Sequence, residues 1–347
     1  GTQNIAVGHE ALISNTTASF NTAIGGYTLH DNTTGTQNAA LGDHALHSNT
    51  TGGQNTGIGI DALRSNTTAS NNTAVGKSAL TVNTTGAQNT ALGTFALDAA
   101  TTANFNVAVG FAALSGTTTG GFNVGIGTSA LFNNTTATEN TALGHECLFN
   151  NTTGSKNTGL GYKALTSNTT GENNTTVGRD SGLNVTTGSN NTFIGKRAGT
   201  SSSPSGAVTT ASNTVCIGDS SVSAAHIQVA FQTGSDKRDK TDITDFNFGL
   251  DWVNKMRPVT YRWDNRDWYK DGSPDGSKKA PQLELGLIAQ EELEIEKEFG
   301  FGQTKEDMLI SSINSSGSYT MKYDRIVPVL INAVKELSQK VTALEAG

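Results

Sequence analysis

The chain has 347 residues, a formal net charge of −7 from 23 Lys and Arg against 30 Asp and Glu, and two cysteines. This acidic balance without a basic patch argues against nucleic acid and against insertion into or binding to an anionic membrane, and no apolar run approaches the ~20 residues of a transmembrane helix. Cys147 and Cys216 stand at positions that small or apolar residues fill elsewhere in the chain, so we expect both to be free and buried.

Charge is distributed unevenly along the chain. Residues 1–234 hold 17 charged side chains, 7 basic and 10 acidic, whereas residues 235–347 hold 36, of which 16 are basic and 20 acidic. The change falls in the segment QTGSDKRDKTDI at 232–243. We therefore predict two parts of different constitution that meet at this segment.

The first part repeats with a fixed period, because an Asn opens a new unit at every seventeenth position. Each unit begins with five residues, such as NTAIG at 21–25, in which a branched aliphatic residue precedes the final Gly. A Leu follows four residues after the Gly in ten successive repeats, from Leu12 to Leu165, and an Asn-Thr-Thr corner usually comes next. A degenerate thirteenth unit starts at Asn213, and the regular units start at Asn4, Asn21, Asn38, Asn55, Asn72, Asn89, Asn106, Asn123, Asn140, Asn157, Asn174 and Asn191.

This pattern predicts a β-solenoid in which each repeat forms one coil. We expect the branched aliphatic residue and the Leu to form two interior ladders, Gly and Asn to supply corners with positive φ, and Thr to lie outside. The density of Gly, Asn and Thr disfavours a helical solenoid. We assign residues 1–200 to twelve coils, which would span roughly 55–60 Å at about 4.8 Å per coil. Residues 201–234 are expected to cap the stack, with strands at 212–219 and 224–231.

Two large aliphatic side chains per coil make a thin core, which favours packing of the coils against other copies of the chain. The units resemble the NSVAIG head repeats of trimeric autotransporter adhesins, which form a β-roll in a trimer, although the period here is longer. They are also similar to runs in phage tail-fibre shafts. The resemblance implies a homotrimer.

Several features of the repeats allow a functional interpretation beside a structural one. The Asn-Thr-Thr corners match N-glycosylation sequons, and the Thr columns fit an ice-binding or glycan-binding array as well as simple solvent exposure. Phe132, Phe149 and Tyr162 can contact a receptor or pack against a neighbouring chain. Acidic residues are too scarce and aperiodic for a calcium-binding β-roll. We expect no metal site and no cofactor, because five of the six His lie at mixed positions of the repeats: His9, His30, His44, His47 and His145.

Residues 235–347 read as an ordinary α+β sequence. A short helix is expected at 248–256, an alternating strand at 259–263, a strand leading into a helix at 283–299, and a strand leading into a final helix at 317–330. The last residues carry an apolar heptad pattern with 3-4-3-4-3 spacing, which predicts a short coiled coil in an assembly, most simply a trimer. The trimerisation residues are Val327, Leu330, Val334, Leu337, Val341 and Leu344.

Four segments in order carry a resemblance to a known family. They are SDKRDKTDI at 235–243, RPVTYRW at 257–263, LGLIAQE at 285–291 and YDRIVPVLINAVKEL at 323–337. Together they are similar to the C-terminal intramolecular chaperone domain of phage endosialidases, tailspikes and tail fibres. The resemblance implies a domain that trimerises, promotes folding of the preceding β-stalk and in many members cuts itself off.

The resemblance also implies a catalytic dyad of a Ser and a Lys five residues later, which are Ser235 and Lys240 here. The chemistry is reasonable, because a Ser hydroxyl needs a base, no His or Cys follows His226, and a buried Lys can act as that base. Arg238 can bond to Asp236 and orient the loop. Asp236 and Asp239 can instead keep Lys240 charged, and the segment can be a charged turn that only positions the domain.

We therefore expect a trimeric fibre or adhesin tip, on a virion or a cell surface, that binds a glycan or protein receptor. Its C-terminal part would be an intramolecular chaperone with a possible single-turnover Ser/Lys self-cleavage and no external substrate. The alternative is a protein that is mainly a self-processing peptidase and that releases a structural, ice-binding or glycan-binding solenoid.

Overall fold

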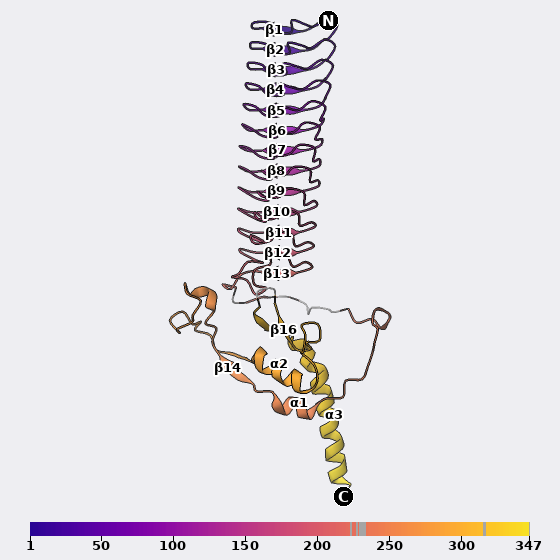
Figure 1. Ribbon diagram of the computed structural model, residues 1–347, viewed down its shortest axis with the longest axis vertical. Coiled ribbons are helices and arrows are strands. Elements are labelled where there is room, and N and C mark those ends of the chain that lie inside the picture. Colours follow the sequence, from indigo (N-terminus) through magenta and orange to yellow (C-terminus); the bar gives the residue numbers. More distant parts are fainter. Residues whose placement is uncertain (223, 227, 229–233, 315–316, 347) are drawn as a thin grey trace. The chain divides into compact units, whose positions relative to one another are not determined.

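The computed structural model describes residues 1–222, 224–226, 228, 234–314 and 317–346. The chain separates into two compact units, Gly1–Ser221 and Val222–Gly347 (Figure 1). The first unit contains the repeats and the second contains nearly all of the charged sequence. Each unit is described by itself below.

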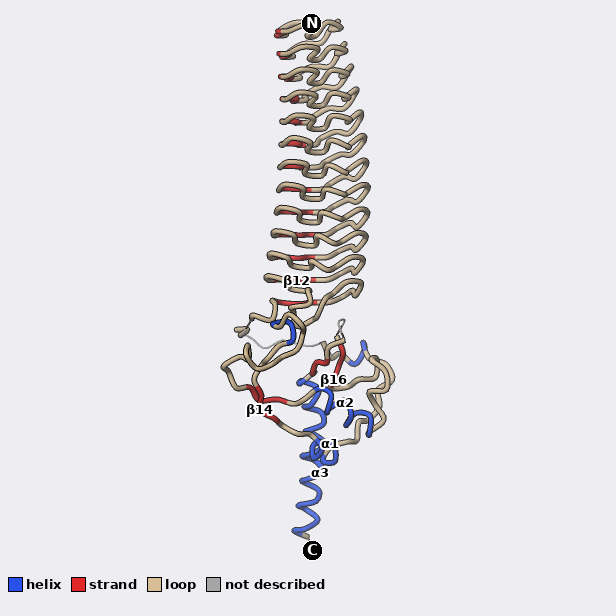
Figure 2. Tube along the Cα trace, turned by 60° about the vertical axis from the view of Figure 1, so that its left-hand side comes forward, coloured by secondary structure: helices blue, strands red, loops and turns tan. Residues whose placement is uncertain are grey.

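The first unit is a β-solenoid, as predicted (Figures 1 and 2). Thirteen strands of three residues stack in sequence order into one parallel sheet, in which each residue of β1 to β12 pairs with the residue one repeat further along. The strands are β1 (Ile5–Val7), β2 (Thr22–Ile24), β3 (Ala39–Leu41), β4 (Thr56–Ile58), β5 (Thr73–Val75), β6 (Thr90–Leu92), β7 (Val107–Val109), β8 (Val124–Ile126), β9 (Thr141–Leu143), β10 (Thr158–Leu160), β11 (Thr175–Val177), β12 (Thr192–Ile194) and β13 (Val215–Ile217). The second closing strand expected at 224–231 falls largely outside the described residues.

One of the two predicted interior ladders is confirmed and the other is wrong. The Leu column is buried in every coil from Leu12 to Leu165. The branched aliphatic column faces outward, because strand residues alternate and the middle residue of each strand, usually Ala or Gly, points inward. The interior of the coil has no room for a second large side chain opposite the Leu, because a Cβ on Gly57 would already lie 3.3 Å from Cγ of Leu46.

The last coils keep the interior filled by a compensating exchange. Gly182 and Gly199 stand in the Leu column, and Phe193 takes the inward strand position in place of Ala. The Phe193 ring is fully buried, and a Cβ on Gly199 would lie 3.0 Å from three of its ring carbons. Large and small residues have exchanged sides while the coil keeps its packing.

The corners differ from the prediction that Gly and Asn supply positive φ. The Gly after each strand does so, and a Cβ on Gly25 would lie 2.8 Å from backbone atoms of Gly42 in the next coil. Three further positions of each coil are left-handed with ordinary residues, as at Gln37, His44 and Leu46. Hydrogen bonds between coils hold these positions, for example from Leu46 N to Ala62 O at 2.9 Å.

The regular spacing of Asn has a different cause from positive φ. The Asn that precedes each of β2 to β12 is buried, and its amide bonds two coils at once: Asn21 Nδ2 donates to Gly35 O, and Asn21 Oδ1 accepts from Asn38 N, both at 2.9 Å. The corner Asn residues form a second ladder, in which Asn49 Nδ2 donates to Asn32 Oδ1 at 2.8 Å. The side chain of Asn49 is fully buried, which supports the structural interpretation of this corner over the glycosylation one.

The second unit is a small α+β unit. Its helices are α1 (Leu250–Lys255), α2 (Ala289–Glu298) and α3 (Ile326–Glu345), with short 3₁₀ turns η1 (Lys237–Asp239), η2 (Arg266–Trp268) and η3 (Tyr323–Arg325). Two antiparallel pairs join β14 (Val259–Tyr261) to β15 (Glu284–Gly286) and β16 (Ser311–Ile313) to β17 (Tyr319–Met321). The predicted C-terminal helix is confirmed, and the strand expected at 259–263 ends two residues earlier.

Aromatic residues dominate the core of this unit. Trp252 is fully buried and stacks on Phe299 with 4.7 Å between ring centroids. Ile295, Ile310 and Val329 complete the buried cluster, so α1, α2 and α3 meet around the indole ring. Among the helices that the structure describes, none has both the length and the apolar character needed to cross a bilayer.

Both cysteines are free and buried, as predicted. Burial raises the pKa of the Cys147 thiol to about 12, so the thiol is protonated and unreactive at neutral pH.

Candidate functional site

The first turn of the second unit brings all four predicted site residues together. Asp236 caps η1 by accepting a hydrogen bond from Arg238 N at 2.9 Å. The Arg238 guanidinium then binds the same carboxylate through Nε at 3.1 Å and Nη2 at 2.6 Å. This side-chain pairing lowers the pKa of Asp236 and raises that of Arg238.

Ser235 and Lys240 lie on either side of this turn. Lys240 Nζ donates a hydrogen bond to Ser235 Oγ at 2.7 Å, although the two residues are five positions apart. Among the described residues, no ion pair joins Lys240 to Asp236 or Asp239, the two carboxylates that could keep the lysine charged. Arg238 binds the carboxylate of Asp236. The turn therefore places a hydroxyl group and an amino group within proton-transfer distance of each other.

The same turn is open to solvent. Ser235, Lys240 and every residue between them are exposed in the single chain. Burial favours the uncharged form of an amine, so a general-base role at this turn would call for a cover that excludes water. The fold of one chain does not supply that cover within its described residues.

A second candidate surface runs along α3. The side of the helix that carries Val329 and Ala333 is buried in the unit. The heptad residues lie on an adjacent side and are 44–82% exposed: Val327, Leu330, Val334, Leu337, Val341 and Leu344. An apolar pocket of about 400 Å³ adjoins this stripe at Leu330 and is also lined by Val253, Met256, Pro258, Leu285 and Tyr323.

Comparison with known proteins bears on this unit. Residues 235–301 match the family model described as "Chaperone of endosialidase". The match begins at Ser235 and ends just after α2, so it supports the C-terminal chaperone domain that the sequence resemblance implied. The repeats of the first unit lie outside the matched residues. No curated protein and no solved structure gave a significant match to the chain.

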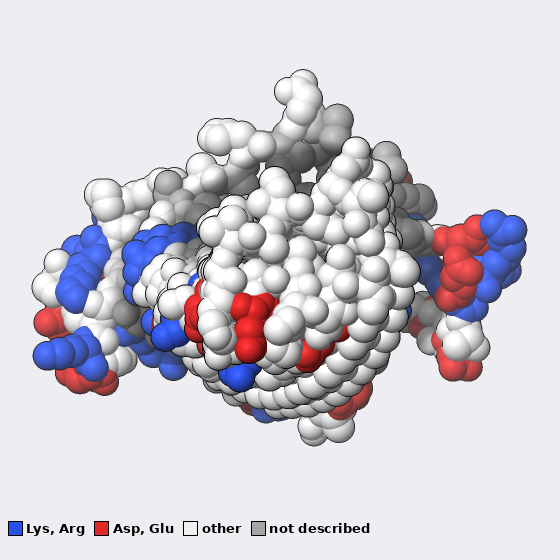
Figure 3. All heavy atoms as spheres, turned by 90° about the horizontal axis from the view of Figure 1, so that it is seen from above, with Lys and Arg blue, Asp and Glu red and all other residues white. Residues whose placement is uncertain are grey.

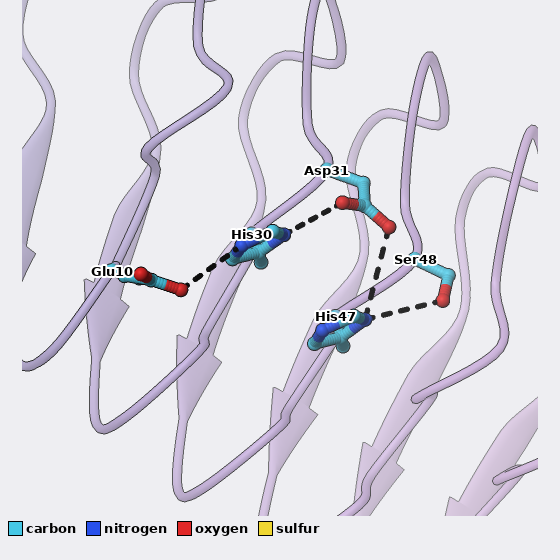
Figure 4. Close-up of polar contacts among 5 residues, drawn as sticks. All are labelled: Glu10, His30, Asp31, His47 and Ser48. Carbon is cyan, nitrogen blue, oxygen red and sulfur yellow. Dashed lines mark hydrogen bonds and ion pairs between the residues drawn. The ribbon is translucent and has the colours of Figure 1, made fainter.

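Sequence reasoning missed a cluster of imidazole rings on the first coils. Tyr27 stacks on His44 with 5.0 Å between centroids, and His30 stacks on His47 at the same separation. Figure 4 shows His30 between Glu10 and Asp31, at 3.3 and 2.6 Å, and His47 beside Asp31 and Ser48. Burial lowers the pKa of His47. The signal was available, because His30 and His47 stand at the same place in successive repeats and therefore share a column.

This cluster is not a metal centre. Over the part of the chain that the structure describes, no three His, Cys, Asp or Glu side chains converge on a point where an ion could be held.

The aromatic residues singled out from the sequence occupy the outer surface of the solenoid. Phe132 stacks on Phe149 with 5.1 Å between centroids, and Tyr162, which is 43% exposed, stacks on His145 at 5.4 Å. Both pairs join residues of successive coils, seventeen positions apart. These residues stabilise neighbouring coils and leave a polar and aromatic surface open to a partner.

Proposed function

We propose that the chain is part of a trimeric, receptor-binding fibre whose second unit is an intramolecular chaperone. The family match over residues 235–301 carries the proposal, because it lies in the same unit as a helix with an uncovered apolar stripe. The chaperone unit would bring three chains together and fix their register before the long β-solenoid winds. The fibre would then serve on a virion or cell surface and bind a glycan or protein receptor.

The helix α3 supports a threefold assembly. Its 20 residues span about 30 Å, and six apolar residues at 3-4-3-4-3 spacing lie along one side. Fewer than three heptads make a marginal free coiled coil, so the helix needs chains that are already held close together. The rest of the chaperone unit would provide that proximity.

We expect the uncut chain, kept whole by Ser235→Ala, to form a trimer of about 108 kDa, three times 36.0 kDa, by light scattering. Val334→Lys with Leu337→Lys should abolish this trimer, because like charges would meet in the helical seam. Gln339→Lys with Ala343→Lys adds the same charge on another side of α3 and should leave the trimer intact. A monomeric uncut chain would contradict the proposal.

We further propose that the turn at 235–240 cuts the chain once, after assembly has covered it. Ser235 Oγ would attack the carbonyl carbon of an adjacent peptide bond while its proton passes to Lys240 Nζ. The leaving amine would take a proton, and water would hydrolyse the ester that remains, so that one peptide bond and one water are consumed.

Mass spectrometry of freshly expressed protein tests this step. The wild-type chain should yield two fragments that identify the bond, whereas Ser235→Ala and Lys240→Ala should stay intact at 36.0 kDa. Lys237→Ala removes an exposed lysine from the same turn and should be cut like the wild type. A wild-type chain that stays intact on prolonged incubation would exclude self-cleavage and leave the trimer proposal standing.

A further inference from the structure

The outer surface of the solenoid sheet carries no charge along its whole length. The first and third residues of each three-residue strand point outward, and we call these 26 positions, two on each of 13 strands, the strand face. The first positions are mostly Thr, with Val, Ile or Ala in the others. The third positions are all branched aliphatic: Val7, Ile24, Leu41, Ile58, Val75, Leu92, Val109, Ile126, Leu143, Leu160, Val177, Ile194 and Ile217.

The charged residues of the solenoid lie elsewhere on each coil. All 17 charged residues within residues 1–234 fall outside the strand face. In the view along the stack, acidic and basic side chains gather on part of the rim of the coils while the rest of the rim is uncharged (Figure 3). The Thr columns of the corners are uncharged as well, as at Thr135 and Thr136, but the strand face combines the absence of charge with an exposed aliphatic column.

The apolar part of this face is too large for an ordinary solvent-exposed surface. Ten of the thirteen aliphatic side chains are 36–63% exposed, and the other three are half-buried. The stripe runs the whole length of the sheet with one aliphatic side chain per coil, and the Thr methyl groups of the first positions extend it. A continuous exposed apolar patch of this kind marks an interaction surface.

We infer that the strand faces of three copies of this chain pack against one another, parallel and in register, along the axis of the fibre. The inference rests on the proposed trimer and names the surface that the solenoids use. In a parallel arrangement with threefold symmetry, each position meets the same position of the other copies, so any charge would face its own sign. This explains why the exclusion of charge is complete. A receptor of fixed charge would not require it.

The narrow coil accounts for the choice of residues. A single coil accepts only Ala or Gly opposite most of its Leu residues, as the Gly57 contact with Leu46 shows. The large strand residues therefore cannot be buried within one chain. Packing between copies gives them the burial that the single solenoid lacks, at about 25 cal/mol for each Å² of apolar surface covered.

Cross-linking of Ile126→Cys, in the full-length chain, tests the interface. In an in-register trimer the three introduced thiols meet near the axis, so mild oxidation or a short bismaleimide should give covalent dimers on denaturing gels. Thr136→Cys, on an exposed corner of the same solenoid, is the matched control and should not cross-link. The wild-type chain controls for Cys147 and Cys216, which are buried.

Two further experiments test the register of the three copies and the stability that their interface contributes. A mixture of Ile126→Cys and Val177→Cys chains, three coils apart, should give no mixed dimers. Ile126→Lys should lower the melting temperature of the trimer by several degrees, whereas Thr136→Lys should leave it unchanged.

The outcomes separate this inference from the proposed function. A trimer by light scattering in which Ile126→Cys does not cross-link, or in which Thr136→Cys cross-links instead, overturns the strand-face interface and leaves the chaperone proposal intact. A monomer by light scattering overturns both.

Discussion

Glu296→Gln is expected to lower the free energy of unfolding of the second unit by about 2–3 kcal/mol. The Glu296 carboxylate is fully buried on α2 and accepts three backbone hydrogen bonds, from Leu309 N at 2.7 Å, Ile310 N at 3.0 Å and Ser311 N at 2.5 Å. A glutamine side chain has one acceptor oxygen, and its NH₂ group would face a backbone donor. At least one buried N–H would lose its partner.

Glu292→Gln is the matched control one helical turn away. Glu292 is also buried but accepts one side-chain hydrogen bond, from Trp252 Nε1 at 2.8 Å, which glutamine can keep. Burial raises the pKa of Glu292. Its folded state therefore holds the proton more readily than the unfolded chain, and this contribution to stability is lost as pH rises through the raised pKa. Glu292→Gln should thus be neutral or stabilising at pH 7.

Urea denaturation followed by tryptophan fluorescence, at one fixed chain concentration, measures both variants. Glu296→Gln should lose stability at pH 7, while the gain from Glu292→Gln should shrink as the pH is lowered toward 4. Equal losses in the two variants would contradict the assigned hydrogen bonds.

Asn151→Ala is expected to destabilise the middle of the solenoid locally by about 2–4 kcal/mol. Asn151 is fully buried, and its Nδ2 donates to Asn134 Oδ1 at 3.0 Å and to Gly154 O at 2.9 Å. Its Oδ1 accepts from Asn168 Nδ2 at 2.8 Å. Truncation would leave the buried Asn134 Oδ1 without its donor and would remove one of the two acceptors of the buried Asn168 Nδ2.

The preceding residue provides the control. Asn150 is exposed and accepts one hydrogen bond, from Asn133 Nδ2 at 3.2 Å, so Asn150→Ala should change stability by less than about 0.5 kcal/mol. Because solenoid coils open locally, amide hydrogen exchange resolved by coil is the suitable measurement. Protection should fall in the coils around Asn151 in the first variant only; equal exchange in both variants would contradict the role of the corner ladder.

The repeat period determined much of the first unit in advance. A spacing of Asn that never slips, together with a Leu column from Leu12 to Leu165, predicts parallel in-register strands and an interior ladder, and both are present. The side on which the branched aliphatic column lies could not be predicted. With three-residue strands, the inward phase depends on coil width, which is set by contacts such as that between Gly57 and Leu46.

In the second unit, the features that depend on residues close in sequence could be predicted. The heptads of α3 and the expected strands and helices follow from spacing and propensity, whereas the role of Glu296 does not. In an acidic helix such as EELEIEKE, a Glu is expected to face solvent. Glu296 is buried because the backbone N–H groups of residues 309–311, which are distant in sequence, bind its carboxylate. The Ser235 and Lys240 pair was suggested by family resemblance, and its 2.7 Å contact depends on a turn that the Asp236 and Arg238 pairing closes.

The exchange between Phe193 and the two glycines makes the coils unequal as building blocks. The coils before β11 pair with the same seventeen-residue offset, form the same Asn hydrogen bonds and have much the same interior. A whole repeat can therefore be gained or lost in evolution while the contacts between neighbouring coils stay the same. Each such event would change the length of the solenoid by about 4.8 Å. Gly182, Phe193 and Gly199 can only be inherited together, because any one without the others leaves a void or a collision. The solenoid is thus free to vary in length from its repeats while its final coils remain a fixed terminus.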